Sequence, residues 1–512
     1  MLRTLRITLA ALCFILLTLL FLDFTGTLHG WFGWMAKIQF MPALLAVNVG
    51  IIVGLLALTL LFGRVYCSVI CPLGVFQDVI SWFASKRKKN RFAYSPALAW
   101  LRYTVLAVYA AAIALGISSF VALLDPYGAY GRIASSFLAP VYQWSNNLLA
   151  YLSERMGNYA FYPVEVTGTG LIVIAIAAIT LVAVVLLAWR GGRTYCNTIC
   201  PVGTLLGFVS RFSIFKPLID IEKCNGCKLC SRNCKASCIN ADEHRIDYSR
   251  CVACMDCIGK CKQGAIKFKP CLFTQAVKPS EVETADSKGV NRRGFVSIAT
   301  GLALAGAAKA QQQLQGDGGL ADIIDKEAPE RKTPVAPPGS ISTRNMTKHC
   351  TGCQLCVAVC DNHVLRAAGG LLTLMQPVMS YEAGYCRPEC VKCSTVCPTG
   401  AIKPLTTADK SATKIGTAKW SKELCTVNVD KQPCDNCARH CPTQAITMIA
   451  NPEAPAQATP QPGAFFGRRP KPLLIPMIDE EKCIGCGACE HLCPARPLSA
   501  IVVEGILMHR TV

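Results

Sequence analysis

The chain has 512 residues, of which 52% are hydrophobic, a mean hydropathy of +0.36 and a formal net charge of +20. This composition is too apolar for a soluble protein and too charged in its second half for a purely membrane-embedded one, so it predicts a membrane part joined to soluble domains. Of the 31 cysteines, 24 fall in six clustered runs, a pattern that argues against a disulfide scaffold. The basic residues gather beside apolar segments and cysteine runs, which argues against a nucleic-acid partner.

Residues 1–215 contain four apolar segments, at 5–23, 41–62, 100–123 and 169–189, each about the 20 residues that a membrane-spanning helix needs. The first segment lacks a small-residue cleavage site and further spans follow it, so we interpret it as an anchor. An α-helical membrane domain with four spans is therefore predicted.

The basic residues of this half predict its orientation. The loop between the second and third spans and the segment after the fourth contain Arg64, Lys86, Arg87, Lys88, Lys89, Arg91, Arg190 and Arg193, whereas the other two loops contain only Lys37, Arg132 and Arg155. Because Lys and Arg are enriched on the cytoplasmic side, we expect both ends of the membrane domain to face the cytoplasm.

A sequence motif occurs twice, as GRVYCSVICPLG at 63–74 and GRTYCNTICPVG at 192–203, with eight of twelve positions identical. It predicts a two-fold internal repeat that brings Cys67, Cys71, Cys196 and Cys200 to the same cytoplasmic face. Two interpretations of these cysteines remain open: packing at a helix boundary, or a redox, ligand or quinone-proximal function.

Histidine gives a useful exclusion. The seven histidines are His29, His244, His349, His363, His440, His491 and His509, and none lies in a predicted span. No Cys-x2-Cys-His motif occurs either, so the sequence predicts no haem.

Residues 216–275 contain two runs of the form Cys-x2-Cys-x2-Cys-x3-Cys. They consist of Cys224, Cys227, Cys230 and Cys234, and of Cys251, Cys254, Cys257 and Cys261. In two-cluster ferredoxins the first three thiolates of such a run hold one [4Fe–4S] cluster and the fourth binds the other cluster. A zinc ribbon is less consistent because each run has a third cysteine. Cys238 competes with Cys234 as the fourth ligand, and Lys235 and Lys262 stand where proline is expected.

Residues 276–345 are predicted to be a linker. Arg292-Arg293, a mildly apolar stretch and Ala308-Lys309-Ala310 resemble a twin-arginine export signal at 291–310, with a linker helix as the alternative. Export would place the rest of the chain outside the cytoplasm, after a flexible or extended tether at 311–345.

Residues 346–512 contain four more cysteine runs, which predict four further [4Fe–4S] clusters and six in the whole chain. The runs are Cys350, Cys353, Cys356 and Cys360; Cys386, Cys390, Cys393 and Cys397; Cys425, Cys434, Cys437 and Cys441; and Cys483, Cys486, Cys489 and Cys493. The predicted fold of both soluble parts is α+β and ferredoxin-like. Spacing alone allows either adjacent or nested pairing of the four runs.

Both halves resemble known families. The four-span half, with its two GRxYCxxICPxG motifs and the paired cysteine runs, resembles the NapH-type membrane quinol dehydrogenase subunit of periplasmic nitrate reduction. The part from NRRGF at 291–295 through the last run resembles the NapG-type and MauM-type ferredoxins. The chain thus resembles a natural fusion of the two. The resemblance implies quinol oxidation, electron delivery to a periplasmic acceptor, and nested pairing of the four distal runs.

We therefore expect a multi-pass protein of a bacterial inner membrane, with a cytoplasmic two-cluster domain and a periplasmic four-cluster domain. Its substrate would be membrane quinol, and its partner a periplasmic reductase or redox carrier. Two alternatives remain: an accessory ferredoxin for metalloenzyme assembly or maintenance, and electron flow from a cytoplasmic ferredoxin to quinone. In each case a bilayer core of about 30 Å would separate the two cluster arrays, so either the quinol or another subunit closes that gap, or one array lies on the opposite side of the membrane.

Overall fold

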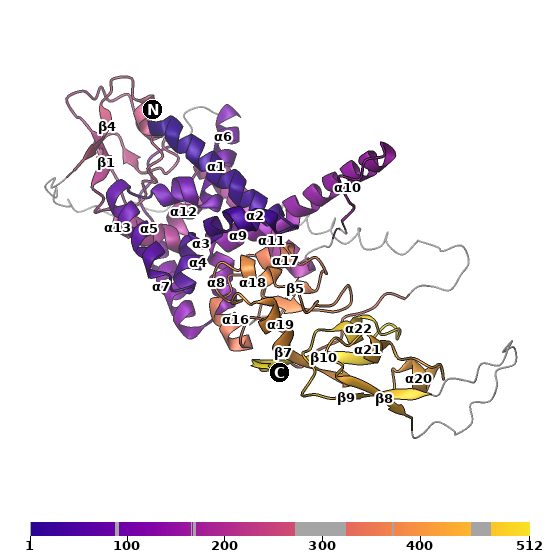
Figure 1. The fold of residues 1–512 in the computed structure, drawn as a ribbon. Coiled ribbons are helices and arrows are strands. Elements are labelled where there is room, and N and C mark those ends of the chain that lie inside the picture. Colours follow the sequence, from indigo (N-terminus) through magenta and orange to yellow (C-terminus); the bar gives the residue numbers. More distant parts are fainter. Residues whose placement is uncertain are drawn as a thin grey trace, which may run out of the picture.

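The computed structural model describes residues 2–87, 92–164, 166, 170–271, 324–370, 373–451 and 473–512. They form a helical region followed by three small modules, which we call the first module (215–270), the second module (335–403) and the third module (413–511) (Figure 1). The predicted export signal at 291–310 lies outside the described residues.

The helical region contains fifteen described elements, of which η1 and η2 are π-helical turns. They are α1 (Leu2–Leu22), α2 (Thr27–Phe32), α3 (Trp34–Lys37), α4 (Phe40–Leu45), α5 (Val49–Phe62), η1 (Tyr66–Ile70), α6 (Pro72–Arg87), α7 (Ala99–Leu115), α8 (Ser118–Leu124), α9 (Pro126–Ile133), η2 (Ala134–Leu138), α10 (Ala139–Arg155), α11 (Leu171–Gly191), α12 (Thr194–Thr198) and α13 (Pro201–Ser210).

Among the described residues, two helices are long and apolar enough to cross a membrane: α1 and α11, each with 21 residues. Both present large apolar side chains to the outside, such as Leu12 on α1 and Ile179 on α11. Exposed apolar surface of this kind is costly in water, so these helices suggest association with a membrane.

The second and third predicted spans are each divided into two shorter helices, so neither segment forms a single long helix. Val47 has a positive φ of 54° between α4 and α5, and Gly116 has a φ of 74° between α7 and α8. A left-handed residue ends a right-handed helix. The pieces α5 and α7 therefore have 14 and 17 residues.

The first module has the strand order of a small ferredoxin. Its elements are β1 (Phe215–Ile219), α14 (Leu229–Arg232), β2 (Ile239–Asn240), β3 (Arg245–Ile246), α15 (Asp256–Lys260) and β4 (Ile266–Pro270). The outer strands β1 and β4 pair antiparallel, and so do the inner strands β2 and β3. One cysteine run lies on each side of the inner hairpin, so the pairing of the outer strands brings the two runs together.

The third module repeats this order. Its elements are β7 (Thr413–Trp420), α20 (Thr426–Val429), α21 (Asn436–Arg439), β8 (Ile446–Ala450), β9 (Leu474–Ile478), α22 (Ala488–His491) and β10 (Ile501–Thr511). Strand β7 pairs with β10 and β8 pairs with β9, all antiparallel.

The second module is a reduced version of the same arrangement. Its elements are α16 (Thr343–His349), α17 (Leu355–Ala358), β5 (Leu365–Ala367), β6 (Pro377–Met379) and α18 (Lys392–Val396), and α19 (Thr407–Ala412) leads into the third module. The inner hairpin β5–β6 is present. The outer pair is reduced to backbone contacts such as Lys403 N–H donating to Gly339 O at 2.9 Å.

Residues 324–345 belong to the folded part, although the sequence predicted a tether there. Lys326 Nζ donates to the carbonyls of Glu490, His491 and Cys493, and Val335 is completely buried and bridges to Met379. The segment is extended and Pro-rich, so it has no periodicity that would have revealed this packing.

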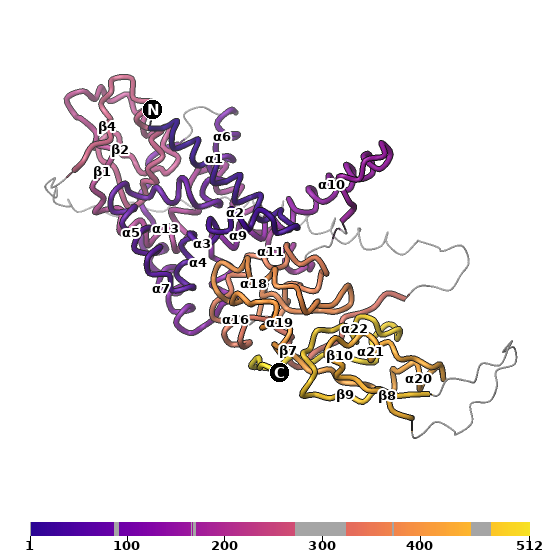
Figure 2. Tube along the Cα trace, in the orientation of Figure 1, coloured from indigo at the N-terminus to yellow at the C-terminus, as the bar shows by residue number. Residues whose placement is uncertain are grey.

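The first module lies at one end of the helical region, and the second and third modules lie at the other end (Figures 1 and 2). The N-terminal end of α1 contacts the first module, where Arg3 Nε donates to Asp256 Oδ1 at 2.8 Å. The other end of α1 shares a hydrophobic core with the second module, in which Phe21 and Tyr127 pack with Cys353 and Leu355. Helix α1 is about 30 Å long, so it separates the two modules by that distance.

Candidate iron–sulfur sites and a cavity at the second module

In the first module the predicted ligands line two separate hollows. One is lined by Cys224, Cys227, Cys230 and Cys261. The other is lined by Cys234, Cys251, Cys254 and Cys257, together with Cys238. Each hollow thus receives three cysteines of one run and the fourth cysteine of the other run, which is the donor set of a [4Fe–4S] cluster.

Cys234 and Cys238 both lie at the second hollow, with their sulfurs 3.6 Å apart. Cys238 is hydrogen-bonded to the sulfurs of Cys234 and Cys251; this bonding raises the pKa of Cys238 and lowers the pKa of Cys234 to about 7. Because Cys251, Cys254 and Cys257 would bind three irons of the cluster, only one of the two thiols Cys234 and Cys238 can bind the fourth iron.

The loops that wrap the hollows turn through left-handed residues on both sides of the second cysteine. They are Gly226 and Lys228, Ala253 and Met255, Gly352 and Gln354, and Gly485 and Gly487. Half of these residues are not glycine, so the turns are not visible in the sequence. They aim successive thiols at a common centre.

In the second and third modules each run pairs with its neighbour along the chain, which corrects the nested pairing implied by the family resemblance. One hollow is lined by Cys350, Cys353, Cys356 and Cys397, and another by Cys441, Cys483, Cys486 and Cys489. The remaining cysteines form two sets of electrostatic neighbours, Cys360 with Cys386, Cys390 and Cys393, and Cys493 with Cys425, Cys434 and Cys437. The antiparallel pairs β5–β6 and β8–β9 each lie between two successive runs, so adjacent pairing joins runs that are neighbours along the chain.

None of the 31 cysteines is paired in a disulfide. Within the described ranges, no three His, Cys, Asp or Glu side chains converge closely enough to hold a single metal ion. The cysteines instead surround hollows, an arrangement that fits a cluster better than a zinc ion.

The second and third modules are joined directly at their cysteine runs. Cys386 N–H donates to Cys486 O at 3.0 Å, and Tyr381 Oη donates to Gly485 O at 2.7 Å. Cys386 belongs to a set in the second module and Cys486 to a set in the third. The four distal sets therefore form a continuous series from Cys353, at the helical region, to Cys493.

The second module lies on the glycines of α9. A Cβ atom on Gly128 would be 2.7 Å from Thr351 O, and one on Gly131 would be 2.5 Å from Cys353 O. These glycines let the loop of the first distal set approach the helix backbone directly.

A buried ion-pair network attaches the first module to the helical region. Asp78 on α6 bonds Arg6 at 2.9 Å, Arg193 at 2.8 Å and Lys235 at 3.3 Å, and Lys235 also bonds Asp256 at 3.0 Å. Burial opposes ionisation of Asp78, but Arg193 and Lys235 hold its pKa well below the usual range. This network explains why Lys235, and not proline, follows Cys234.

In the second module, Asp361 follows Cys360 where proline is expected, and its carboxylate pairs with Lys392 at 2.6 Å.

Cys67, Cys71, Cys196 and Cys200 come together in the helical region, each no more than 4% exposed. The two motifs also make reciprocal contacts. Arg64 Nη2 donates to Cys196 O at 3.2 Å, and Arg193 Nη1 donates to Cys67 O at 2.6 Å. Gly74 and Gly203 leave the space through which these arginines pass.

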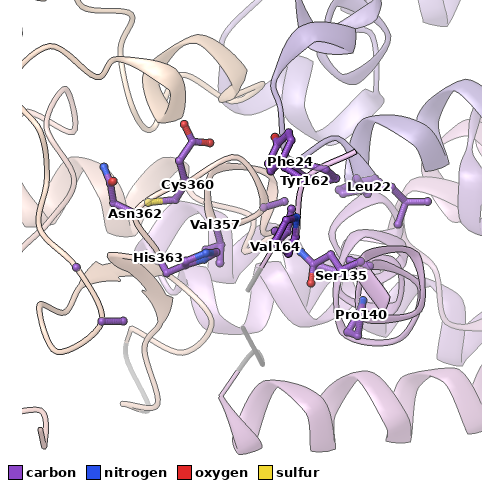
Figure 3. Close-up of a pocket in the computed structure, with 18 of the residues that line it drawn as sticks. Leu22, Phe24, Ser135, Pro140, Tyr162, Val164, Val357, Cys360, Asn362 and His363 are labelled. Carbon is purple, nitrogen blue, oxygen red and sulfur yellow. The ribbon is translucent and has the colours of Figure 1, made fainter. Parts of the chain in front are cut away.

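A cavity with a volume of about 610 Å³ lies between the helical region and the second module (Figure 3). Leu22, Ser135 and Pro140 line it on the helical side, and Cys360, Asn362 and His363 face them from the second module. Asp361, Arg387 and His491 add polar groups. The cavity thus has an apolar wall and a polar wall, and the polar wall includes a predicted cluster ligand.

Comparison with known proteins identifies 4Fe-4S domains in the chain. The model of a 4Fe-4S binding domain matches residues 44–91 and 172–221, and the model of a 4Fe-4S dicluster domain matches residues 432–496. The chain therefore contains 4Fe-4S domains of the ferredoxin type. The matches at 44–91 and 172–221 contain the two GRxYCxxICPxG motifs, which sequence analysis had placed in the membrane domain.

Several ferredoxin-type proteins are similar to about a third of the chain. The methylamine utilization ferredoxin-type protein MauM of Methylobacillus flagellatus is 28% identical over 34% of this chain and 70% of its own length. The ferredoxin-type protein NapG of Escherichia coli is 27% identical over 39% of this chain and 78% of its own length. The ferredoxin-type protein NapF of Escherichia coli is 28% identical over 34% of this chain and 87% of its own length. No solved structure matches the chain.

The ferredoxin-type modules carry out iron–sulfur electron transfer. A [4Fe–4S] cluster supplies one-electron chemistry at a potential that is set by charge, hydrogen bonds to sulfur and solvent exposure. The cysteine sets described above would hold such clusters, and the loops around them would control the contact of each cluster with water.

Proposed function

We propose that this chain is a membrane-bound protein that oxidises quinol and passes the electrons through [4Fe–4S] clusters to a periplasmic reductase or redox carrier. The main support is the cavity at the second module, because it combines an apolar wall with polar groups beside Cys360. The six cysteine sets would hold six clusters. From Cys360 at the cavity, the series continues through the two sets of the third module towards Cys493.

The arrangement around α1 supports a transmembrane orientation. A 21-residue helix of about 30 Å matches the hydrocarbon core of a bilayer. Arg3 contacts the first module at one end and Phe21 packs near the second module at the other. On this orientation the first module is cytoplasmic, as the basic residues predict, and the second and third modules are periplasmic.

Oxidation of a quinol releases two electrons and two protons, so its site needs an electron acceptor and proton acceptors close together. Cys360 lies in the cavity wall and would bring a cluster to the edge of the quinol ring. Asp361, His363 and His491 provide carboxylate and imidazole groups on the same wall. The apolar wall, which includes Leu22 and Pro140, suits the ring and its isoprenoid tail.

Anaerobic mixing with a reduced quinol analogue tests the function, with cluster reduction followed by absorbance and EPR. Ala139→Trp, on the cavity wall, should abolish reduction by quinol while dithionite still reduces every cluster. Leu148→Trp is the matched control because it lies on the same helix, is 60% exposed and does not line the cavity.

The outcomes separate the alternatives. Quinol reduction at the normal rate in Ala139→Trp would reject the cavity as the quinol site. Failure of quinol to reduce the wild-type protein would reject the quinol dehydrogenase function. Oxidation of pre-reduced protein by quinone, without the forward reaction, would reverse the direction of electron flow.

A further inference from the structure

Helix α10 presents its apolar side to the outside and its polar side to the protein. Val141, Trp144, Leu148, Tyr151 and Leu152 recur at the spacing of one helix face, and each is 48–65% exposed. A helix on the surface of a soluble protein has the opposite arrangement, with its apolar face on the core. These five residues, which we call the outward face, therefore leave a large apolar surface uncovered by the described chain.

The opposite face of α10 is already covered. Asn146 Nδ2 donates to Tyr162 O at 2.9 Å, and Asn147 exchanges two hydrogen bonds of 2.8 Å with the backbone of Val164. Ala150, on the same side of the helix, is buried. The chain thus satisfies these polar side chains with its own backbone, and the apolar side chains are left for a partner.

Helix α10 begins at the level where the two candidate membrane helices meet the second module. Tyr142 packs against Phe24, just after α1, with ring centroids 6.0 Å apart. Phe21 of α1 shares a core with the second module, and Val173 at the start of α11 is buried against Met375 of the same module. Figure 1 shows α10 projecting away from the helical region. A membrane that contained α1 and α11 would have its surface at this level.

The composition of the outward face suits lipid. Trp144 and Tyr151 combine an apolar ring with a polar tip, and such residues are enriched where hydrocarbon meets water. No charged residue occurs in 133–153. A surface that docks a charged macromolecule uses complementary charge, which this part of the chain does not have.

We propose that α10 lies in the plane of the membrane surface, with its outward face against the glycerol groups and acyl chains of phospholipids. Helices of this kind bury their apolar face at the boundary between headgroups and acyl chains. Because 133–153 is uncharged, the binding would depend on apolar area and not on anionic lipid.

This position of α10 would bring the cavity at the second module to the membrane surface. Ala139, Pro140 and Gln143, at the start of α10, line the cavity, and so do Tyr162 and Val164, which cover the polar face of the helix. A quinol would then enter from the lipid along α10. That route rests on the proposed function, whereas contact between α10 and lipid requires no quinol.

Photocrosslinking tests the contact in the full-length protein, reconstituted in phosphatidylcholine nanodiscs. Leu148→p-benzoylphenylalanine should form phospholipid adducts under ultraviolet light, detected by mass spectrometry of the labelled peptide. Met477→p-benzoylphenylalanine is the matched control, because Met477 is 54% exposed on β9 of the third module and should form no adduct. Ile179→p-benzoylphenylalanine, at an exposed position of α11, tests the membrane domain itself.

The position of the adduct along the lipid tests the orientation of α10. Ile179 lies near the middle of α11, so its adducts should fall deep in the acyl chains. Adducts at Leu148 should lie nearer the glycerol group. Their yield should stay the same when phosphatidylglycerol replaces part of the phosphatidylcholine, because 133–153 carries no charge to attract it.

The outcomes distinguish failure of this inference from failure of the proposed function. Adducts at Ile179 with none at Leu148 would reject the position of α10 and leave the membrane domain intact. Crosslinks from Leu148 to a second copy of the chain would replace lipid by an interface between copies. Adducts equally deep at both positions would make α10 a membrane-crossing helix, and a several-fold higher yield with phosphatidylglycerol would reject the apolar basis of binding. Absence of adducts at both positions would reject the membrane-bound protein that the proposed function requires.

Discussion

At the scale of single residues, Cys234 and Cys238 are alternative ligands for the same iron of one predicted cluster. The other five sets all take their fourth ligand from the Cys-x3-Cys position, which is Cys234 in this run. We expect Cys234→Ala to lose one cluster, with the matching loss of iron and of one EPR signal. Cys238→Ala should keep the cluster but shift its potential, because Cys238 bonds two ligand sulfurs. Loss of the cluster in Cys238→Ala alone would reverse this assignment.

His509 on β10 should make the stability of the third module depend on pH. Burial lowers the pKa of His509 to about 4, and neither ring nitrogen has a hydrogen-bond partner. The unfolded imidazole, with a pKa of about 6.5, binds a proton that the folded one does not. Stability is therefore complete above pH 6.5 and falls as the pH drops towards 4, by about 1–2 kcal/mol at pH 5.

Amide exchange of the β7–β10 pair measures this effect locally. His509→Phe should remove the extra exchange seen at pH 5 relative to pH 7. His440→Gln, at an exposed position in the same module, should leave it unchanged. Equal acid sensitivity in His509→Phe and in the wild type would show that another group is responsible.

At the scale of elements, Asp78 links α1, α6, the start of α12 and the first module through one carboxylate. Asp78→Asn would leave Arg193, which is completely buried, without a counter-charge. Removing one partner of a buried pair costs about 3–5 kcal/mol. We expect a clear drop in the thermal stability of the detergent-solubilised protein, and faster amide exchange around Lys235.

Glu243→Gln is the control for this change. It removes a carboxylate from an exposed pair with Arg245 in the same module, where both side chains are more than half exposed. Such pairs contribute little to stability. If Asp78→Asn and Glu243→Gln behaved alike, the network would not be what attaches the first module.

The elements also show what the sequence could and could not predict. The spacing of the cysteines predicted that the fourth cysteine of each run lies with the first three cysteines of the other run, because the geometry of two-cluster ferredoxins requires that spacing. The break at Val47 could not be predicted, since a β-branched residue rarely adopts a positive φ. Adjacent pairing and the function of Lys235 depend on contacts between distant segments, which spacing does not encode. The convergence of Cys67 and Cys196 was predicted from the repeated motif, but the reciprocal arginines were not.

At the scale of the whole molecule, the cysteine sets form a series with a defined order. The first module lies at one end of α1, the four buried thiols lie beside it, and the second module lies at the other end (Figure 1). The third module extends the series to Cys493, whose set includes Cys425 at the start of α20; the last residue of α20, Val429, is exposed.

The contact between the second and third modules should control whether electrons reach this end. A Cβ on Gly487 would lie 2.1 Å from the ring of Tyr381, which is completely buried and held by its hydrogen bond to Gly485 O. Gly487→Ala therefore combines a left-handed alanine, at about 1–2 kcal/mol, with overpacking of about 1–3 kcal/mol. We expect the modules to separate locally, which lengthens the electron-transfer distance.

Gly400→Ala is the matched control, because Gly400 also has a positive φ, of 71°, but open space around its Cβ position. Rapid freeze-quench EPR would follow the arrival of electrons at the clusters of the third module. In Gly487→Ala these clusters should be reduced more slowly than in Gly400→Ala, with iron content unchanged in both. Equal rates would mean that electrons do not pass between Cys386 and Cys486, and the third module would then need a separate electron donor.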